Sequence, residues 1–381
     1  MGWYAKQRAA DRIARAAGAG LDLVAFWNEV GEAIAAAIPH HLTPCWYTLD
    51  PASLLATSHY DHGLIPELPP EWLAHEYHEE DFQSLGEVAR SPSGISTLHD
   101  ATGGDPSRSR RWQIFMQPYG GDQELLVSLR TAAGETWGML ALYRESGQPL
   151  FDREELELLR LAAPGLAEGA RRGLLIGAAA DPDTPDAPGL VVLSEDWQIE
   201  SLTPGVERWL ESLPGGAPRD SGRLPPSLLA VAGRALRTAE RDTPGEVAVT
   251  RVLADDGRWI VLHGATLISD GTRRVAVIVE PASRARISPL LMSAYGLTER
   301  EQEITRLVLR GESTTQIAQT LYISPHTVQQ HLKSVFEKTG VRSRRELVGK
   351  VFFAHYEPRL RDNERRAIDG RPLRGDPSPA A

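Results

Sequence analysis

Residues 297–352 read LTEREQEITRLVLRGESTTQIAQTLYISPHTVQQHLKSVFEKTGVRSRRELVGKVF, and they are the most informative part of the chain. Thr298, Ser313 and Ser343 are each followed three residues later by Glu or Gln, which is the spacing of a capping box at a helix start. A fourth start is Ser324-Pro325, because Ser is a favoured N-cap and Pro is tolerated at the first helical position. These signals predict four short helices in one C-terminal domain.

The apolar residues between the caps recur at helical spacing: Leu297, Ile304, Leu307 and Val308; Ile317, Ala318 and Leu321; Val328, Leu332, Val335 and Phe336; Leu347, Val348, Val351 and Phe352. Four such stripes can close one small core. Only Tyr322-Ile323-Ser324 joins the second helix to the third, and a connection this short makes two helices cross steeply. The third helix ends at Gly340, a residue suited to a left-handed C-terminal cap. The sequence therefore predicts a helix-turn-helix.

The outward face of the third predicted helix is polar and compact. Glutamines on this face can pair bidentately with adenine, and Lys333 can meet guanine or the backbone. Residues 324–350 contain six cationic and two acidic side chains, a net charge of +4, which attracts a phosphate backbone. We therefore predict double-stranded DNA as a partner, contacted by Ser324, His326, Thr327, Gln329, Gln330, Lys333, Lys338, Arg342 and Arg344.

Residues 297–352 resemble, over their whole length, the C-terminal domain of LuxR-type transcriptional regulators. The resemblance is carried by Leu297-Thr298-x-Arg300-Glu301, Gly311-x-Ser313, Ile317-Ala318, Ile323-Ser324, Thr327-Val328, His331-Leu332 and Lys338-x-Gly340-Val341-x-Ser343-Arg344. It implies sequence-specific promoter binding, and we expect a homodimer on a two-fold site. RNA polymerase stays open as a further partner. The family usually has Lys or Arg where this chain has Gln329, so one customary DNA contact is replaced by a neutral amide.

The charge of the chain is unevenly distributed. The 381 residues have a net charge of −10, yet residues 289–356 carry +3 and residues 1–288 carry −14. A basic module beside an acidic body indicates that only the C-terminal part meets nucleic acid. A single cysteine, Cys45, excludes an internal disulfide and a cysteine-rich zinc site. No stretch approaches eighteen apolar residues and residues 1–20 lack a signal-peptide core, so we expect a cytoplasmic protein without a membrane partner.

Residues 20–175 alternate between helical and strand patterns. An apolar stripe from Leu23 to Ile38 predicts a helix, and residues 44–49 a strand. Residues 124–130 and 137–144 predict a hairpin. Asp152 then caps a long helix, bent or interrupted at Pro164. This order resembles a GAF domain. The resemblance implies an α+β fold in which the small-molecule ligand, where the domain has one, lies between the sheet and residues 58–117.

The leucines of that long helix allow two interpretations, which the sequence leaves open. Leu156, Leu159, Leu166 and Leu175 can pair across a dimer, or they can cover the sheet of their own domain, because both uses bury the same residues.

Residues 181–189 are rich in Pro and Asp and predict a linker. Strands follow at 189–194, 198–201, 247–253, 259–267 and 274–280, with a short helix at 204–210 and a hairpin turn at Asp256-Gly257. Residues 188–282 thereby resemble a PAS domain. The predicted fold is thus two α+β sensory domains, GAF-like and then PAS-like, followed by an all-α helix-turn-helix domain at 289–356 and a disordered tail at 357–381.

The residues offer no catalytic motif. We find no GxxxxGK loop, GxSxG elbow or HExxH pair, so we predict no enzyme. His59-x-x-His62 and His75-x-x-His78 with Glu79-Glu80-Asp81 contain donors that suit zinc or iron, but this spacing also arises by chance in helices, and we predict neither metal nor cofactor. The aromatic residues form a pocket or simply core: Trp46, Tyr47, Trp72, Tyr77, Phe82 and Trp112. Two alternatives stay open: a GAF-bearing signalling enzyme, and an interaction protein that reads no DNA.

Overall fold

A computed structural model describes residues 3–61, 72–176, 188–216, 223–241, 246–255, 257–269, 272–282, 292, 295–309 and 311–348. They belong to two compact units, one drawn from residues 1–177 and 187–281 and the other mainly from residues 282–381. The predictions for His62, for most of the linker at 181–189, for Asp256 and for the tail at 357–381 lie outside the described residues.

The first unit contains two five-stranded antiparallel sheets. The strands of the first sheet are β1 (His41–Leu49), β2 (Ala56–Tyr60), β3 (Ile95–Thr97), β4 (Gly121–Arg130) and β5 (Thr136–Glu145). The strands of the second are β6 (Gly189–Ser194), β7 (Ile199–Leu202), β8 (Val249–Leu253), β9 (Trp259–Ser269) and β10 (Thr272–Pro281). Each sheet places its strands in the same order, second, first, fifth, fourth, third. The hairpin predicted at 124–130 and 137–144 is confirmed as β4 and β5.

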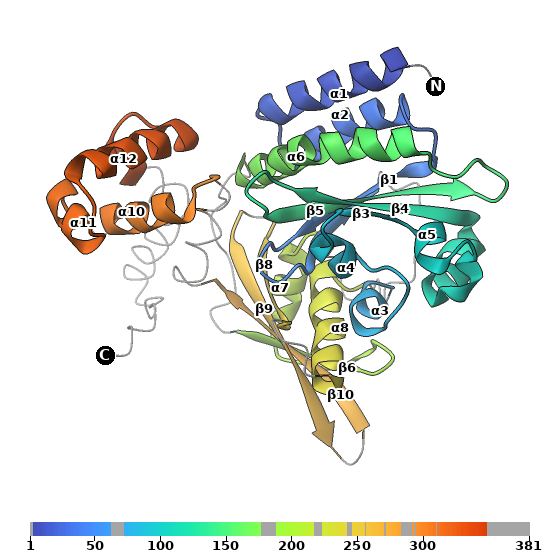
Figure 1. The fold of residues 1–381 in the computed structure, drawn as a ribbon. Coiled ribbons are helices and arrows are strands. Elements are labelled where there is room, and N and C mark those ends of the chain that lie inside the picture. Colours follow the sequence, from blue (N-terminus) through green and yellow to red (C-terminus); the bar gives the residue numbers. More distant parts are fainter. Residues whose placement is uncertain are drawn as a thin grey trace. The chain divides into compact units, whose positions relative to one another are not determined.

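Three helices cover one face of the first sheet: α1 (Trp3–Gly18), α2 (Leu23–Ala35) and α6 (Arg153–Ile176) (Figure 1). The sequence analysis assigned no element to α1, which packs on α2 and α6. Pro164 lies inside α6 without ending it. Leu159 and Leu166 are fully buried in the core between this helix and its own sheet. The interpretation of these leucines as a dimer seam is therefore wrong for Leu159 and Leu166.

The opposite side of the first sheet carries short segments: α3 (Trp72–His78), α4 (Leu85–Arg90), α5 (Leu98–Thr102), η1 (Pro106–Arg108), η2 (Trp112–Met116) and η3 (Gln117–Tyr119). The sequence analysis assigned no elements here. None of these segments exceeds seven residues, so none offers the repeated apolar spacing by which a helix is recognised. Side-chain caps start three of them, at Ser84, Thr97 and Asp105.

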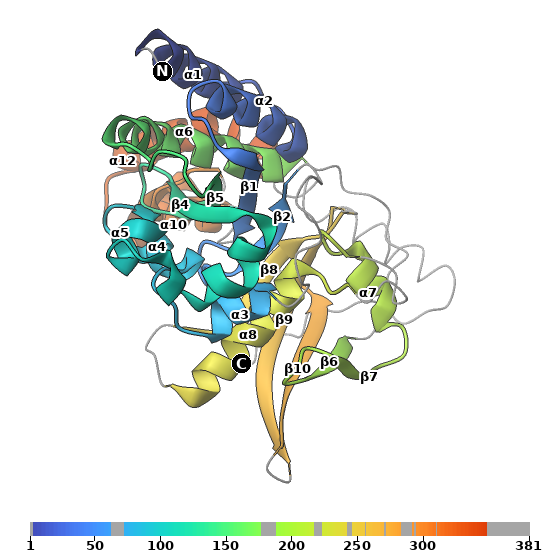
Figure 2. The ribbon, with the colours of Figure 1, turned by 90° about the vertical axis from the view of Figure 1, so that its right-hand side faces the viewer.

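The second sheet is accompanied by α7 (Val206–Ser212) and α8 (Pro226–Glu240). Helix α8 packs on β9 and β10 of its own sheet and also on α3 and β2 of the first part, and Figure 2 shows α3 and α8 side by side. One hydrophobic core runs through both parts. Asp50 at the end of β1 accepts hydrogen bonds from the backbone N–H of Arg251 (2.9 Å) and from its guanidinium (2.5 Å). The two α+β parts therefore form one packed unit.

A glycine allows the close approach of α8 to α3. A Cβ atom at Gly233 would lie 2.2 Å from the carbonyl oxygen of Ala74. Gly233→Ala should therefore destabilise the first unit by about 1–3 kcal/mol, because backbone has to move. In the control, Gly18→Ala on α1, the new methyl meets nothing within 4 Å. This change should stabilise slightly, as Gly to Ala does in an open helix. Urea unfolding of both variants tests the pair, and a neutral Gly233→Ala would contradict the close packing.

The C-terminal unit is helical. Its elements are α10 (Glu299–Leu309), α11 (Thr314–Thr320), α12 (Pro325–Thr339) and a helical segment at 344–348. Their buried residues form one core: Met292, Leu297, Ile304, Leu307, Val308, Ile317, Ala318, Val328, Leu332, Val335, Val341 and Leu347. Leu321 and Phe336 pack against it partly buried, whereas the prediction of Val348 as a core residue is wrong, because its side chain is 38% exposed. No helix in the described ranges has the length and apolar character needed to cross a membrane.

Candidate nucleic-acid interface

The turn between α11 and α12 is fixed by local hydrogen bonds. Ser313 and Gln316 form the predicted capping box, with Ser313 N donating to Gln316 Oε1 (2.7 Å) and Gln316 N donating to Ser313 Oγ (3.3 Å). Ile323 N donates to Ala318 O (3.0 Å), closing the turn. Ser324 Oγ then accepts from Thr327 N (3.0 Å) and starts α12. Tyr322 stands in this turn at φ 53°, with its side chain 95% exposed.

Helix α12 has one buried and one exposed face. Val328, Leu332 and Val335 are buried against α10 and α11. The residues predicted to contact DNA on this helix lie on its other side: Ser324, His326, Gln329, Gln330 and Lys333 are exposed, and Thr327 is half-buried. Within the described part of the chain, the side chains of Gln329 and Lys333 form no hydrogen bond or ion pair, and the Gln330 amide lies 3.2 Å from His326 Nε2. That these residues contact DNA stays a prediction.

Glu301 ties α10 to α12, a role that the sequence analysis missed beyond its capping box. The carboxylate is 4% exposed. It accepts hydrogen bonds from Thr298 N (2.8 Å), Ser334 Oγ (2.7 Å) and Lys338 Nζ (2.6 Å). Burial raises the pKa of Glu301, but the bonds from Lys338, Ser334 and Thr298 outweigh it and hold that pKa below its usual value. Lys338, predicted as a DNA contact, is thus also an internal partner of Glu301.

The residues after α12 form a second basic segment. Arg342 is exposed, and its backbone N–H donates to Glu346 Oε2 (2.8 Å). Glu346 N donates to Ser343 Oγ (3.1 Å), but the Glu346 side chain reaches Arg342 rather than Ser343, so the third capping box is present only in its forward half. The Arg344 guanidinium donates to the carbonyl oxygen of Glu312, which fastens this segment to the start of α11.

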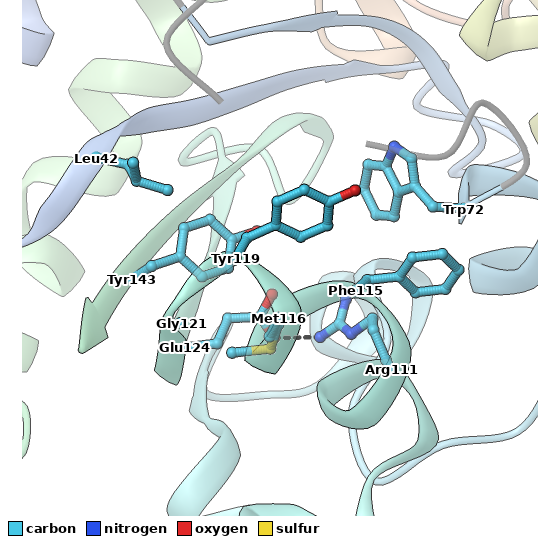
Figure 3. Close-up of a pocket in the computed structure, with 9 residues that line it drawn as sticks. All are labelled: Leu42, Trp72, Arg111, Phe115, Met116, Tyr119, Gly121, Glu124 and Tyr143. Atoms are coloured by element: carbon cyan, nitrogen blue, oxygen red, sulfur yellow. Dashed lines mark hydrogen bonds and ion pairs between the residues drawn. The ribbon is translucent and has the colours of Figure 1, made fainter. Parts of the chain in front are cut away.

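The first unit contains a cavity of about 40 Å³ between β1, β4, β5 and the segment η2–η3 (Figure 3). It lies where the GAF resemblance implied a ligand. The lining is mostly apolar or aromatic: Leu42, Trp72, Arg111, Phe115, Met116, Tyr119, Gly121, Glu124 and Tyr143. Arg111 is buried and pairs with Glu124 and, at 2.9 Å, with Glu76. Burial raises the pKa of Glu76 to about 7, although Arg111 opposes this change.

Most of the predicted aromatic residues lie in the core or at the cavity, and Phe82 lies at the surface. Trp46 stacks on Trp27 at 4.5 Å under the helices of the opposite face, whereas Trp72 lines the cavity. Tyr77 is buried beside α8, and Phe82 is 37% exposed. The ring nitrogen of Trp112 donates to Asp122 O (3.2 Å). Sequence spacing could not separate these uses, because both bury the ring.

The histidines offered as metal ligands have other partners. His75 Nδ1 lies 2.8 Å from Glu79, and His78 Nε2 lies 3.4 Å from Glu240 on α8. His59 stacks on Tyr47 at 4.7 Å. Among the residues that the structure describes, no three metal-binding side chains converge.

Comparisons with known proteins concern mainly the C-terminal unit. Residues 296–351 match the family model of bacterial regulatory proteins, luxR family. A putative HTH-type transcriptional regulator of Mycobacterium bovis is 48% identical over 55 residues, which are 14% of this chain and 6% of that protein. The spore germination protein GerE of Bacillus subtilis is 38% identical over 52 residues, which are 14% of this chain and 70% of GerE.

Among solved structures, VqmA of Vibrio cholerae, determined as a complex with ligand and DNA, is similar at 16% identity. The match covers 45% of this chain and 84% of VqmA, with a TM-score of 0.22. A score this low does not establish a shared overall fold.

Proposed function

The chain belongs to the luxR family of bacterial regulatory proteins through its C-terminal domain, and we propose that it regulates transcription by placing α12 in the major groove of promoter DNA. The observation that carries this proposal is the exposed polar face of α12, where Gln329 and Lys333 have no partner in the described part of the chain. An α-helix fits the major groove of DNA, where amide side chains can bond to base edges and cationic side chains to phosphates.

The proposed contacts divide into two groups. Gln329 and Gln330 read base edges, while Ser324, His326, Thr327 and Lys333 position the helix on the backbone or the groove wall. Arg342 adds an exposed cation after α12. Lys338 bonds to the carboxylate of Glu301, and Arg344 bonds to the carbonyl oxygen of Glu312. Because both side chains already have a partner inside the domain, we propose that they act on DNA through their positive charge near a phosphate.

The two glutamines can be tested against the lysine. Gln329→Ala or Gln330→Ala should relax base preference, at a cost of about 1–3 kcal/mol at one base pair. Lys333→Ala should weaken binding to all DNA sequences. It should also reduce the slope of the logarithm of the binding constant against the logarithm of the salt concentration by about one. The measurement is fluorescence anisotropy on a DNA site obtained by in vitro selection and on its single-base variants, at several salt concentrations.

A control for these variants is Gln7→Ala, an exposed glutamine on α1 in the other unit. It should leave affinity, base preference and salt dependence unchanged. Unaltered base preference in both glutamine variants of α12 would contradict the assignment of the reading face. A chain that binds no DNA in a salt-dependent way would instead support the interaction protein that reads no DNA.

We further propose that the first unit is sensory, with GAF-like and PAS-like parts, and that a small molecule enters the cavity of Figure 3. Its mostly apolar walls and its single buried Arg111–Glu124 pair resemble the usual make-up of ligand pockets. Binding there would shift the population of arrangements in which a homodimer presents its two α12 helices. The mycobacterial relative is named a transcriptional regulator, which favours this function over a signalling enzyme.

A further inference from the structure

Three arginines gather around one glutamate where α4 meets α8. We name Arg90, Arg234, Arg237 and Glu246 the Arg234 cluster. Glu246 lies 3.5 Å from Arg90, 3.8 Å from Arg234 and 3.3 Å from Arg237. Among the described residues, it is the one acid within ion-pair distance of any of the three arginines. The cluster therefore carries an excess of two positive charges.

The nearby acids are engaged elsewhere. Glu240 on α8 pairs with Arg273 (2.5 Å) and lies near His78, and Glu80 pairs with Arg241. The neighbouring aromatic residue cannot neutralise the excess either. The Tyr77 ring lies 5.5 Å below the Arg234 guanidinium, and its hydroxyl is already used between Ala56 N and Leu54 O.

Arg234 is deeply buried, and two of its nitrogens make no hydrogen bond. It is 3% exposed, and its Nε and Nη1 atoms make no hydrogen bond, nor does Nε of Arg237. Burial lowers the pKa of Arg234, Glu246 and Tyr77 raise it, and Arg90 and Arg237 lower it again. Buried donors in folded proteins nearly always have a partner, and an orphaned one calls for a bound ion or water.

Two of the guanidiniums also lie near the same glycine. A Cβ atom at Gly86 would lie 3.4 Å from Arg90 Nη1 and 3.7 Å from Arg234 Nη2. Like charges this close repel unless an anion lies between or beside them. Planar guanidiniums match the oxygens of phosphate, which accept several donors at once.

We infer that the Arg234 cluster binds a small oxyanion, a phosphate or a phosphomonoester group, between α4 and α8. The anion accepts from the nitrogens of Arg234 and Arg237 that make no hydrogen bond and from Arg90, whose side chain is 43% exposed and forms the open side of the site. Glu246, whose Oε2 also makes no hydrogen bond, is the carboxylate with which the anion competes. Because α4 belongs to the first sheet and α8 to the second, the bound anion joins the two α+β parts. This site is separate from the cavity of Figure 3 and does not depend on the function proposed for it.

Binding can be measured with the full chain and inorganic phosphate. Isothermal titration and thermal unfolding in sodium phosphate are compared with sodium chloride at equal ionic strength. We expect saturable heat and a rise in Tm that grows with phosphate concentration, since a ligand that binds only the folded state stabilises it. A second titration, with glycerol phosphate, distinguishes a phosphomonoester ligand from free phosphate. Tighter binding of the ester indicates a phosphorylated metabolite, and equal or weaker binding indicates free phosphate. No saturable difference between phosphate and chloride overturns the inference.

Variants localise the effect. Arg234→Met keeps an unbranched apolar side chain but removes the donors, and Arg90→Gln changes a half-exposed position. Each should weaken phosphate binding by about tenfold or more, the usual effect of losing a charged hydrogen bond. Glu246→Gln removes the competing carboxylate and should strengthen binding. Arg160→Gln, on the exposed side of α6, is the matched control and should have no effect. Unchanged affinity in Arg90→Gln, or weaker affinity in Glu246→Gln, contradicts the site.

Discussion

Leu166→Glu is expected to unfold most of the first unit. Leu166 is fully buried between α6 and its sheet. The substitution removes the packing of a core leucine and places a carboxylate where the neighbouring buried side chains are apolar. The two effects together should cost at least about 4 kcal/mol, a large part of the stability of an ordinary domain. The measurement is urea unfolding of the full chain, followed by circular dichroism, with sedimentation to record the assembly state.

The same helix provides the control. Leu161 is 66% exposed, so Leu161→Glu should leave the unfolding transition within about 0.5 kcal/mol of the parent. If α6 pairs across a dimer, its outward side, where Leu161 lies, is the face available. Leu161→Glu would then yield a folded monomer. A folded, stable Leu166→Glu protein would contradict the packing of α6 on its own sheet.

Glu301→Ala is expected to destabilise the C-terminal unit by roughly 2–4 kcal/mol. Three donors, from Thr298, Ser334 and Lys338, lose their common acceptor. The cost stays below that of a fully buried ion pair because Lys338 is 34% exposed and can turn to water. Hydrogen exchange should increase across residues 297–348, and DNA binding should weaken with it. Glu337→Ala, an exposed acid on α12, is the control and should not change exchange in the core.

The pH dependence of this unit follows from the same carboxylate. The folded state holds the pKa of Glu301 below its usual value, which is near 4.3 in an unfolded chain. Its contribution to stability is therefore complete above the unfolded pKa and is lost as the pH falls through the folded pKa. Acid unfolding of the parent should be steeper than that of Glu301→Gln, in which no proton is taken up at this position. Equal slopes would contradict a charged Glu301 in the folded state.

The sequence predicted those elements whose apolar residues fall on one face. The helix-turn-helix repeats short capped stripes. Strands β4 and β5 are buried almost throughout and were recognised as apolar runs on either side of the turn at 133–135. Strands β9 and β10 follow the turn at Gly257. Helix α8 was not predicted, and the burial of ten consecutive residues, 227–236, comes from its packing against α3 on one side and β9 on the other, which is tertiary information. The short segments on the far side of the first sheet were missed because each is shorter than two and a half helical turns.

The candidate sites show the same division between local and tertiary information. Exposure of Gln329, Gln330 and Lys333 follows from spacing along α12, and the structure places them as expected. The ion pair of Lys338 with Glu301 could not be predicted from spacing, because Glu301 lies 37 residues earlier in the chain. The two side chains meet only where α10 packs on α12. The Arg234 cluster was also invisible in the sequence. Its members come from two domains, and nothing in the spacing of Arg90 and Arg234 indicates that they lie near the same glycine.

Helix α8 approaches its neighbours closely on two sides, at a glycine in each case. On one side Gly233 brings it against the backbone of Ala74, and on the other Gly264 of β9 would clash with Val231 if it carried a Cβ, at 2.8 Å. Interdigitated side chains can rearrange their rotamers and absorb a small displacement, whereas backbone in direct contact cannot. A shift of α3 is therefore transmitted to the second sheet almost undamped. We therefore expect the two α+β parts to move together, so that a displacement of α3 also displaces the second sheet.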